Sequence, residues 1–381
     1  MARIILGSYM VQYPLGGNLS WALQWLVGLS DRGDDVCFVE KAAYPNACFD
    51  PTRQVMSDDC SHGISVLRQL LQPWQLHNKF CFVDALGSYH GMDRKSIEDA
   101  FSRADLFIDM GTHGAWLAEA ATAGLRVLVE LEPAYTQIKM QAAKDKGHFA
   151  PAYDAYYTNG LNIGKSASSA PVAGVAWRHV MNPVIPRLFS AGAPPANASF
   201  TTVMNWQSHE TVEFNGIQYG QKDVEFEKFE SLPFLVDVPM EIAVAGRGVP
   251  RERLTSRGWR LRDAHNVTRS VESYLNYIHY SRGEFAVCKN VFVATNSGWF
   301  SDRSAAYLAS GRPVVVQATG FESHLPCGEG LFAVRSPAEA AEAIESVVAD
   351  YPRHSRAARK IALEYLDAKV VLGRFLSELG I

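Results

Sequence analysis

Residues 296–316 read Asn-Ser-Gly-Trp-Phe-Ser-Asp-Arg-Ser-Ala-Ala-Tyr-Leu-Ala-Ser-Gly-Arg-Pro-Val-Val-Val, and they carry the strongest structural signal in the chain. A glycine-containing turn leads into a helical pattern over 301–310, which Gly311 ends as a helix C-cap would. The apolar run 313–317 then forms a strand. A turn, a helix and a buried strand in this order are one unit of a sheet with helical crossovers.

The start of this helix predicts an anion site. The first N–H groups of a helix lack backbone partners and, together with the helix dipole, suit a diphosphate. Ser301 and Ser304 add hydroxyl donors, and Arg303 adds a positive charge. The structural alternative makes Ser301 the N-cap and Asp302 a favourable charge at the dipole.

Strand-like and helix-like segments alternate along the rest of the chain. In the first half we expect strands at 3–9, 35–40, 80–84, 105–110 and 126–131, with helices at 20–32, 96–103, 115–123 and 135–144. A second series begins with a strand at 199–204 and a helix at 221–231. This alternation predicts an α/β protein with two Rossmann-like, doubly wound parallel-sheet domains facing a cleft.

The domain boundary is expected where the composition changes. The stretch 160–195 is rich in Gly, Ser and Pro, although 177–189 within it reads as helical. We therefore expect an N-terminal domain at 1–195, a second domain at 196–352 and terminal helices at 353–381.

The composition excludes several classes of protein. The length of 381 residues suggests two domains, and 48% apolar with 20% charged residues is ordinary for a globular protein. The net charge of −4 counts against a nucleic-acid binder, and no apolar run approaches a membrane span. The six cysteines are scattered, in a spacing that suits neither a zinc site nor a disulfide framework. With an N-terminus that reads as a strand, this predicts a reduced, cytoplasmic protein.

Four short motifs carry a resemblance to a known family. They are Tyr-Pro-Leu-Gly-Gly-Asn at 13–18, Glu-Leu-Glu-Pro at 130–133, Tyr-Gly-Gln-Lys at 219–222 and the stretch 298–304. Over most of its length the chain resembles GT-B glycosyltransferases, in particular a bacterial glycosyltransferase-like group. The resemblance implies that 1–195 is an acceptor domain and 196–352 a nucleotide-sugar domain that binds a nucleoside-diphosphate sugar. It also implies that the terminal helices at 353–381 pack back on the first domain. Many retaining members have a Glu that holds the donor ribose, where this chain has Ala306.

The resemblance also names candidates for donor binding. Gly16 and Gly17 would let the first loop approach a ligand closely, unless they only form a tight turn. Lys222 would neutralise the diphosphate leaving group, unless it is an exposed helix lysine. Further donor contacts are expected from two loops after strands, which contribute Gly298, Trp299, Phe300 and the 301–304 residues, and Gly320, Phe321 and Glu322.

Three residues are candidate general bases for an acceptor hydroxyl. Asp109 and His113 follow one strand of the first domain, and Glu132 follows the next. Any of these residue types can accept a proton near neutral pH. Each also has a structural alternative, as a loop or helix-entry residue, and the sequence does not choose among them.

A nucleobase site is expected near the ends of strands in the second domain. Trp206, Arg262 and Asp263 lie there and could stack on or pair with a base, although Trp206 could equally be core. The chain has no Asp-x-Asp, P-loop, GxGxxG, HExxH or GxSxG. We therefore expect no metal and no cofactor besides the donor substrate.

These patterns lead to one function and two alternatives. The leading prediction is a metal-independent glycosyltransferase, whose partners are a nucleotide sugar and a hydroxyl-bearing acceptor. A sugar-nucleotide epimerase on the same scaffold and a non-enzymatic two-domain binding protein are the alternatives. No nucleic acid and no stable membrane insertion are expected, and a homodimer stays open.

Overall fold

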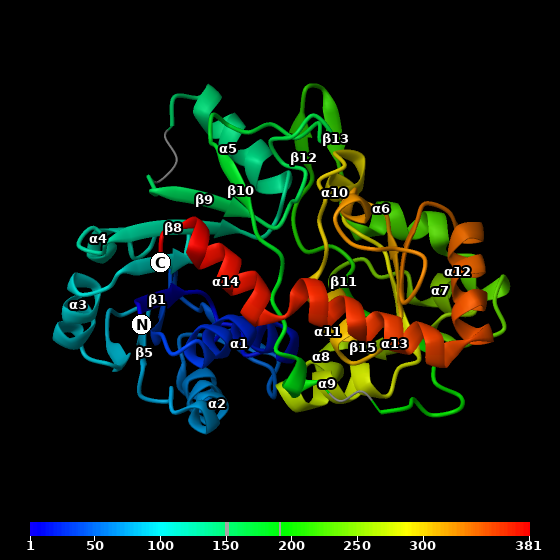
Figure 1. Ribbon diagram of the computed structural model, residues 1–381, viewed down its shortest axis with the longest axis horizontal. Coiled ribbons are helices and arrows are strands. Elements are labelled where there is room, and N and C mark those ends of the chain that lie inside the picture. The colour runs from blue at the N-terminus through cyan, green and yellow to red at the C-terminus, as the bar shows by residue number, and fades with distance from the viewer. Residues whose placement is uncertain (149–151, 190–191) are drawn as a thin grey trace.

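The computed structural model describes residues 1–148, 152–189 and 192–381, which form two sheets lying side by side (Figure 1). The first sheet has the order β10-β9-β8-β7-β1-β2-β5-β6. Its strands pair in parallel except for β5 with β6. The bounds are β1 (Arg3–Gly7), β2 (Asp35–Lys41), β5 (Phe80–Val83), β6 (Tyr89–Gly91), β7 (Leu106–Asp109), β8 (Leu125–Glu130), β9 (Ala155–Thr158) and β10 (Trp177–His179).

Helices cover both faces of the first sheet. They are α1 (Gly16–Asp31), α2 (Ser61–Leu71), α3 (Arg94–Ser102), α4 (Leu117–Ala120) and α5 (Tyr135–Asp145), with a small hairpin of β3 (Cys48–Asp50) and β4 (Val55–Ser57). The helix α1 is buried along nearly its whole length rather than on one face. It lies between the sheet and the rest of the molecule, which explains why its sequence is apolar all round.

The second sheet is wholly parallel, in the order β15-β14-β11-β16-β17-β18. Its strands are β11 (Phe200–Asn205), β14 (Met240–Ala245), β15 (Arg260–Asp263), β16 (Gly283–Ala286), β17 (Val314–Gln317) and β18 (Leu331–Val334). Its helices are α6 (Lys222–Phe226), α7 (Arg251–Ser256), α8 (Ala264–Val267), α9 (Val271–His279), α10 (Asn290–Ala294), α11 (Asp302–Ala309) and α12 (Pro337–Ala349). A hairpin of β12 (Val212–Phe214) and β13 (Ile217–Tyr219) precedes α6.

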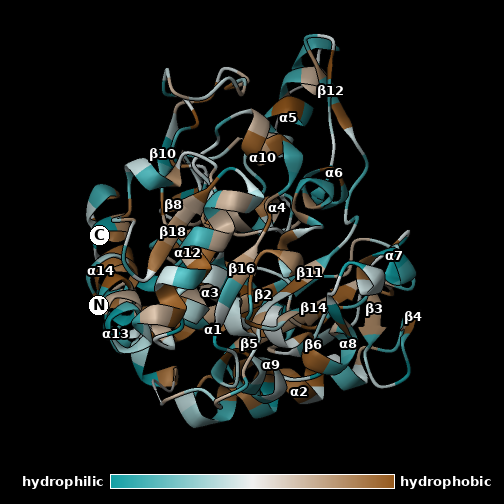
Figure 2. Ribbon diagram, turned by 90° about the vertical axis from the view of Figure 1, so that its right-hand side faces the viewer, coloured by the Kyte–Doolittle hydropathy of each residue, from teal (hydrophilic) through white to brown (hydrophobic). Residues whose placement is uncertain are grey.

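The last helices connect the two halves. The helix α13 (Tyr351–Ile361) packs beside α11, a π-helical turn follows at Ala362–Leu366, and α14 (Ala368–Glu378) returns to lie against α1 (Figure 1). Gly28 of α1 permits this contact, since a Cβ there would lie 2.7 Å from Leu372. Apolar segments of strands and α1 lie inside, whereas α7 and α13 at the periphery are largely hydrophilic (Figure 2).

The predicted α/β class with two doubly wound sheets is confirmed, but one expected element is wrong. The helix expected over 177–189 is replaced by β10 and a 3₁₀ turn at Pro186–Leu188. Trp177 packs edge-on against Tyr156 of β9, so that β10 extends the sheet. Pro183 and Pro186 lack the N–H groups that a continuous helix would need. No helix in the described residues is both long and apolar enough to cross a bilayer.

Candidate active site between the two halves

The two halves meet where the strands of both sheets end. Gly160, after β9, pairs with Trp299, and the backbone N–H of Asn162 donates to the carbonyl of Ser297 (3.0 Å). Gly298 has a φ of +77°, and a Cβ there would lie 2.7 Å from the backbone nitrogen of Asn162. Gly298, which the sequence predicts to contact the donor, therefore lacks a side chain because the backbone of the N-terminal half packs closely against it.

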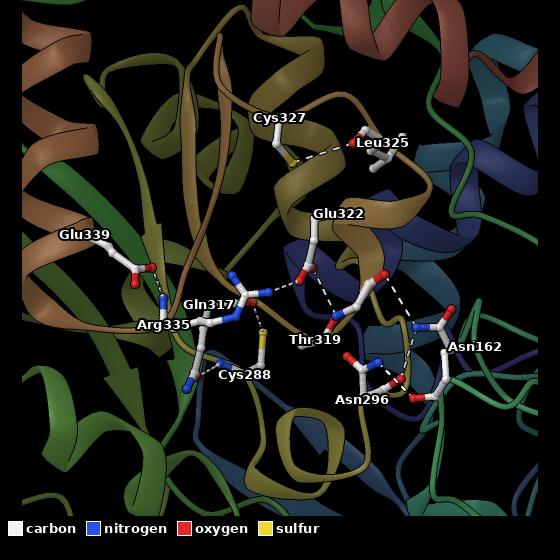
Figure 3. A network of polar contacts seen from close by, with 12 residues as sticks. Asn162, Cys288, Asn296, Gln317, Thr319, Glu322, Leu325, Cys327, Arg335 and Glu339 are labelled. Carbon is white, nitrogen blue, oxygen red and sulfur yellow. Dashed lines mark hydrogen bonds and ion pairs between the residues drawn. The ribbon is translucent and has the colours of Figure 1, made fainter.

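The turn at 320–322 belongs to the same contact. The side-chain amide of Asn162 donates to the carbonyls of Asn296 (3.1 Å) and Gly320 (3.5 Å), as Figure 3 shows. Glu322 accepts the N–H of Gly320 (3.0 Å) and pairs with Arg335 (2.5 Å) (Figure 3). Phe321 is fully buried. These contacts give the predicted donor-sugar turn a structural role at the junction.

Beside this junction lie three cations, Lys222, Lys289 and Arg303, here called the basic cluster. Lys222 opens α6 after the β12–β13 hairpin, Lys289 precedes α10 after β16, and Arg303 lies in the first turn of α11. Although they are far apart in sequence, the three lie close enough for the charges of Arg303 and Lys289 to lower the pKa of Lys222. All three side chains are largely buried.

Two members of the basic cluster are paired. The Nζ of Lys289 lies 2.5 Å from Glu132 Oε2, across the junction. Arg303 forms a buried ion pair with Glu284 of β16 and also donates to the carbonyl of Val203 (2.8 Å). One guanidinium nitrogen of Arg303 and one oxygen of Glu284 are buried without a partner in the described structure.

Lys222 is different, because it is 8% exposed and has no hydrogen-bond or ion-pair partner among the described residues. Burial lowers its pKa from 10.5 to about 7, and the neighbouring charges of Arg303 and Lys289 add to this effect. An unpaired buried cation is costly, so an isolated lysine here is unfavourable without a ligand. An anion bound among these three side chains would supply the missing charge.

Three serines lie in the segment 297–304, which also contains Arg303 of the basic cluster. The Oγ atoms of Ser297 and Ser304 are buried and make no hydrogen bond in the described structure. Ser301 caps α11 by accepting the N–H of Arg303 (3.1 Å), so its structural alternative is confirmed. Burial raises the pKa of Asp302, despite the opposing charge of Arg303. Ser297 and Ser304 are thus the hydroxyls left free for a ligand.

The three candidate bases lie in different surroundings. Asp109 is fully buried and accepts the N–H groups of Gly111, Thr112 and Gly114 and the hydroxyl of Tyr153 (2.6 Å). Such a saturated carboxylate holds its loop in shape. His113 is exposed, with a φ of +53° in that loop.

Glu132 is the candidate that lies at the junction. Besides Lys289 it faces His209, whose Nε2 lies 3.6 Å from Glu132 Oε1 and whose ring stacks on Tyr135. Burial alone would raise the pKa of Glu132, but the charges of Lys289 and His209 lower it overall. The carboxylate is therefore ionised at neutral pH and links both halves to the basic cluster.

Known proteins resemble this chain in structure only. No protein-family profile matches it, and no curated protein is detectably similar. Sucrose-phosphate synthase from Thermosynechococcus elongatus is 13% identical, with a TM-score of 0.55 over 100% of this chain and 99% of its own. Anabaena HepE, solved with UDP and glucose, is 12% identical, with a TM-score of 0.57 over 100% of both chains. An α-glucosyltransferase solved with UDP and a 13-mer DNA is 8% identical, with a TM-score of 0.56 over 99% and 98%.

The chain has the GT-B fold. In this fold the glycines of the first loop lie against the second half. A Cβ on Gly16 would lie 2.1 Å from the carbonyl oxygen of Ser270, and Gly17 faces the ring of Tyr274 at 3.6 Å. The N–H of Gly16 also donates to the carbonyl of Thr268 (2.6 Å). Both glycines therefore serve the contact of α1 with the second half.

The predicted nucleobase residues are not brought together in this GT-B chain. Trp206 is buried against Phe226, with ring centroids 5.4 Å apart, in the core of the second half. Arg262 pairs with Glu241 (2.8 Å), and Asp263 caps α8. Arg262 and Asp263 line a cavity of about 740 Å³ beside α9, and Trp206 is not among the residues that line this cavity.

The remaining loop residues shape the GT-B junction. Trp299 packs on Phe292 (4.8 Å between ring centroids) and Phe300 on Phe321 (5.1 Å). Sequence reasoning missed Lys289, Glu284 and His209. Lys289 could have been found, because it directly follows a buried strand-like run, whereas His209 lies in a long loop with no such signal.

Proposed function

We propose that the protein transfers a sugar from a nucleoside-diphosphate sugar to a hydroxyl of a small-molecule or glycan acceptor. The observation that carries this proposal is Lys222, which is buried and unpaired beside Lys289 and Arg303. Ser304, whose hydroxyl has no partner, directly follows Arg303 in α11. Cations and hydroxyl donors arranged in this way bind a diphosphate and stabilise it as a leaving group without a metal. GT-B neighbours solved with UDP support the same assignment.

In the proposed reaction the bond between the sugar C1 and the diphosphate oxygen breaks. A bond from C1 to the acceptor oxygen forms, and the acceptor hydroxyl loses its proton. The diphosphate keeps the electron pair and is neutralised by the basic cluster. We assign the proton to Glu132, because it is the candidate base at the junction.

The acceptor is expected to be uncharged or weakly charged. The DNA in one neighbour belongs to that protein, and the net charge of −4 here does not favour a polyanion. The absence of Asp-x-Asp favours a donor site that works without a divalent cation. Because Ala306 stands in place of a ribose-binding Glu, ribose recognition would depend on other residues.

Nucleotide binding tests the proposal directly. UDP, GDP, TDP, ADP and CMP are titrated by calorimetry with and without Mg²⁺, using the wild type, Lys222→Met and the exposed control Lys95→Met. We expect one diphosphate to bind without Mg²⁺, and Lys222→Met to weaken it about 10- to 100-fold, the cost of one charge-assisted contact. Substituting Arg303 is less informative, since it would leave Glu284 buried and unpaired.

The products then define the reaction. Incubation of the donor with an acceptor panel should release the nucleoside diphosphate only when a sugar is transferred. Glu132→Gln should lower kcat by about 10²- to 10⁴-fold, the range for a general base. If an epimerised nucleotide sugar forms without an acceptor, the protein is an epimerase and the proposal of sugar transfer is wrong. No binding by any nucleotide would refute the donor site and favour the binding-protein alternative.

A further inference from the structure

A second group of ligand-type side chains lies at the other edge of the first sheet. Cys60 directly precedes α2, Asp84 follows β5, and His90 lies in β6. The Sγ of Cys60 lies 3.6 Å from Nε2 of His90, and Nε2 lies 2.9 Å from Oδ2 of Asp84. All three atoms lie within 4.8 Å of one another.

The arrangement does not fit a catalytic triad. In a Cys-His-Asp relay the thiol and the carboxylate contact different ring nitrogens. Here both contact Nε2, so the three atoms converge on one point. Thiolate, imidazole and carboxylate ligands around a tetrahedral zinc ion lie about 3.3–3.6 Å apart, given bond lengths of about 2.0–2.3 Å. The 3.6 Å separation of Cys60 Sγ from His90 Nε2 lies in this range, whereas the 2.9 Å separation of His90 Nε2 from Asp84 Oδ2 is that of a hydrogen bond, which a bound cation would replace.

The neighbouring structure holds these ligands in place. The other oxygen of Asp84 accepts the N–H groups of Leu86 and Ser88, both at 2.9 Å. His90 is paired in register with Phe82 of β5, and Cys60 is 7% exposed. The thiol has no other hydrogen-bond partner in the described residues. Ligands fixed by second contacts in this way are typical of metal sites.

A cavity of about 710 Å³ opens beside two of the three ligands, because Cys60 and His90 line it together with Asp59, Ser61 and Tyr89. We propose that Cys60, Asp84 and His90 bind a divalent zinc-type cation whose fourth position faces this cavity. The thiol and the imidazole favour Zn²⁺ over Mg²⁺ or Ca²⁺. Binding displaces the thiol proton to solvent, and the neutral imidazole binds the cation through Nε2 with its single ring proton on Nδ1.

This site is independent of the proposed sugar transfer. Three strands, β7, β1 and β2, separate β5 from β8. Glu132 follows β8 and pairs with Lys289 of the basic cluster. The cation therefore does not neutralise the diphosphate. It ties the loop before α2 to the β5–β6 turn, and Phe49 of the hairpin in that loop contacts His265 of the second half (5.7 Å between ring centroids).

Metal binding by the whole chain tests the proposal. Chelator-treated protein is titrated with Zn²⁺ against a chromophoric competitor, and with Co²⁺ to detect a sulfur-to-cobalt charge-transfer band. We expect one ion per chain, and a loss of affinity of about 100-fold or more in Cys60→Ser, Asp84→Asn and His90→Gln. The band should vanish in Cys60→Ser. Asp84→Asn keeps an oxygen for the Leu86 and Ser88 N–H groups, so the turn should survive.

The controls are Cys327→Ser, which removes an exposed thiol, and His62→Gln, which changes a histidine near the site that is not a proposed ligand. Both should bind like the wild type, and circular dichroism of each metal-free variant shows that it is folded. Less than one ion per chain, or equal affinity in folded Cys60→Ser, would overturn the site. Nucleotide binding should be unchanged after chelation, so a failure here is distinct from a failure of the donor site.

Discussion

Replacing Lys222 by Met should stabilise the free protein while it weakens nucleotide binding. The pKa of this buried lysine falls from 10.5 to about 7 on folding, which corresponds to about 5 kcal/mol at roughly 1.4 kcal/mol per pH unit. The cause is chiefly burial, with Arg303 and Lys289 adding to it. Met fills a similar volume without a charge to desolvate.

The effect has a defined pH dependence. Between about pH 7 and pH 10.5 the unfolded chain binds a proton at Lys222 that the folded chain does not, so the stability contributed by this residue rises with pH. Below pH 7 the full cost of about 5 kcal/mol is present, and above pH 10.5 it is gone. The advantage of Lys222→Met should therefore be largest at pH 6.5 and fall by about 2–3 kcal/mol by pH 9.

Thermal unfolding at these two pH values measures the difference. For domains of this size about 1 kcal/mol shifts Tm by roughly 2–4 °C, so the gap between variant and wild type should be several degrees wider at pH 6.5. Lys95→Met, an exposed control, should show no gap that depends on pH. A Lys222→Met protein that melts below the wild type, or by the same margin at both pH values, would refute the reasoning.

Three further substitutions test single contacts. Gly16→Ala should lower Tm by several degrees, because its Cβ would lie 2.1 Å from the carbonyl oxygen of Ser270. Gly17→Ala should not lower Tm, since the nearest atom would lie 3.6 Å from its Cβ. Equal Tm values for the two variants would contradict this reasoning. Ser304→Ala should leave Tm unchanged and weaken UDP binding about 5- to 10-fold by calorimetry, since its hydroxyl has no partner in the free protein. Asp109→Ala should lower the free energy of unfolding, measured with urea, by about 3 kcal/mol or more, because three N–H groups and the hydroxyl of Tyr153 lose their acceptor. A smaller loss would argue against a structural role for Asp109.

Local signals in the sequence were sufficient for much of the fold. Ser301 caps α11 as its position predicts, and Gly311 follows the end of that helix. Capping depends on residues within one turn, so a single sequence contains the necessary information. The same is true of the strand and helix alternation, which gave both sheets.

Contacts between distant segments could not be predicted in this way. Gly16 and Gly298 read as loops that approach a ligand, but their close neighbours are Ser270 and Asn162 in the opposite halves. A glycine shows that something approaches the backbone without showing what it is. The cysteine spacing predicts no zinc site, and the proposed site of Cys60, Asp84 and His90 would leave no spacing pattern, because these residues come from three separate elements.

Charge balance at the junction gives a last, sharper prediction. Glu132 now holds Lys289, and a diphosphate in the basic cluster would compete for the same ammonium group. Removing the carboxylate charge in Glu132→Gln should therefore tighten UDP binding, by about 5-fold if the pair is worth about 1 kcal/mol. Lys289→Met should weaken binding, and the double variant should match Lys289→Met alone, because Glu132 acts on the nucleotide through Lys289. Calorimetry measures UDP binding by the wild type, the two single variants and the double variant. Weaker binding by Glu132→Gln would show that the carboxylate helps to bind the nucleotide and does not compete with it for Lys289.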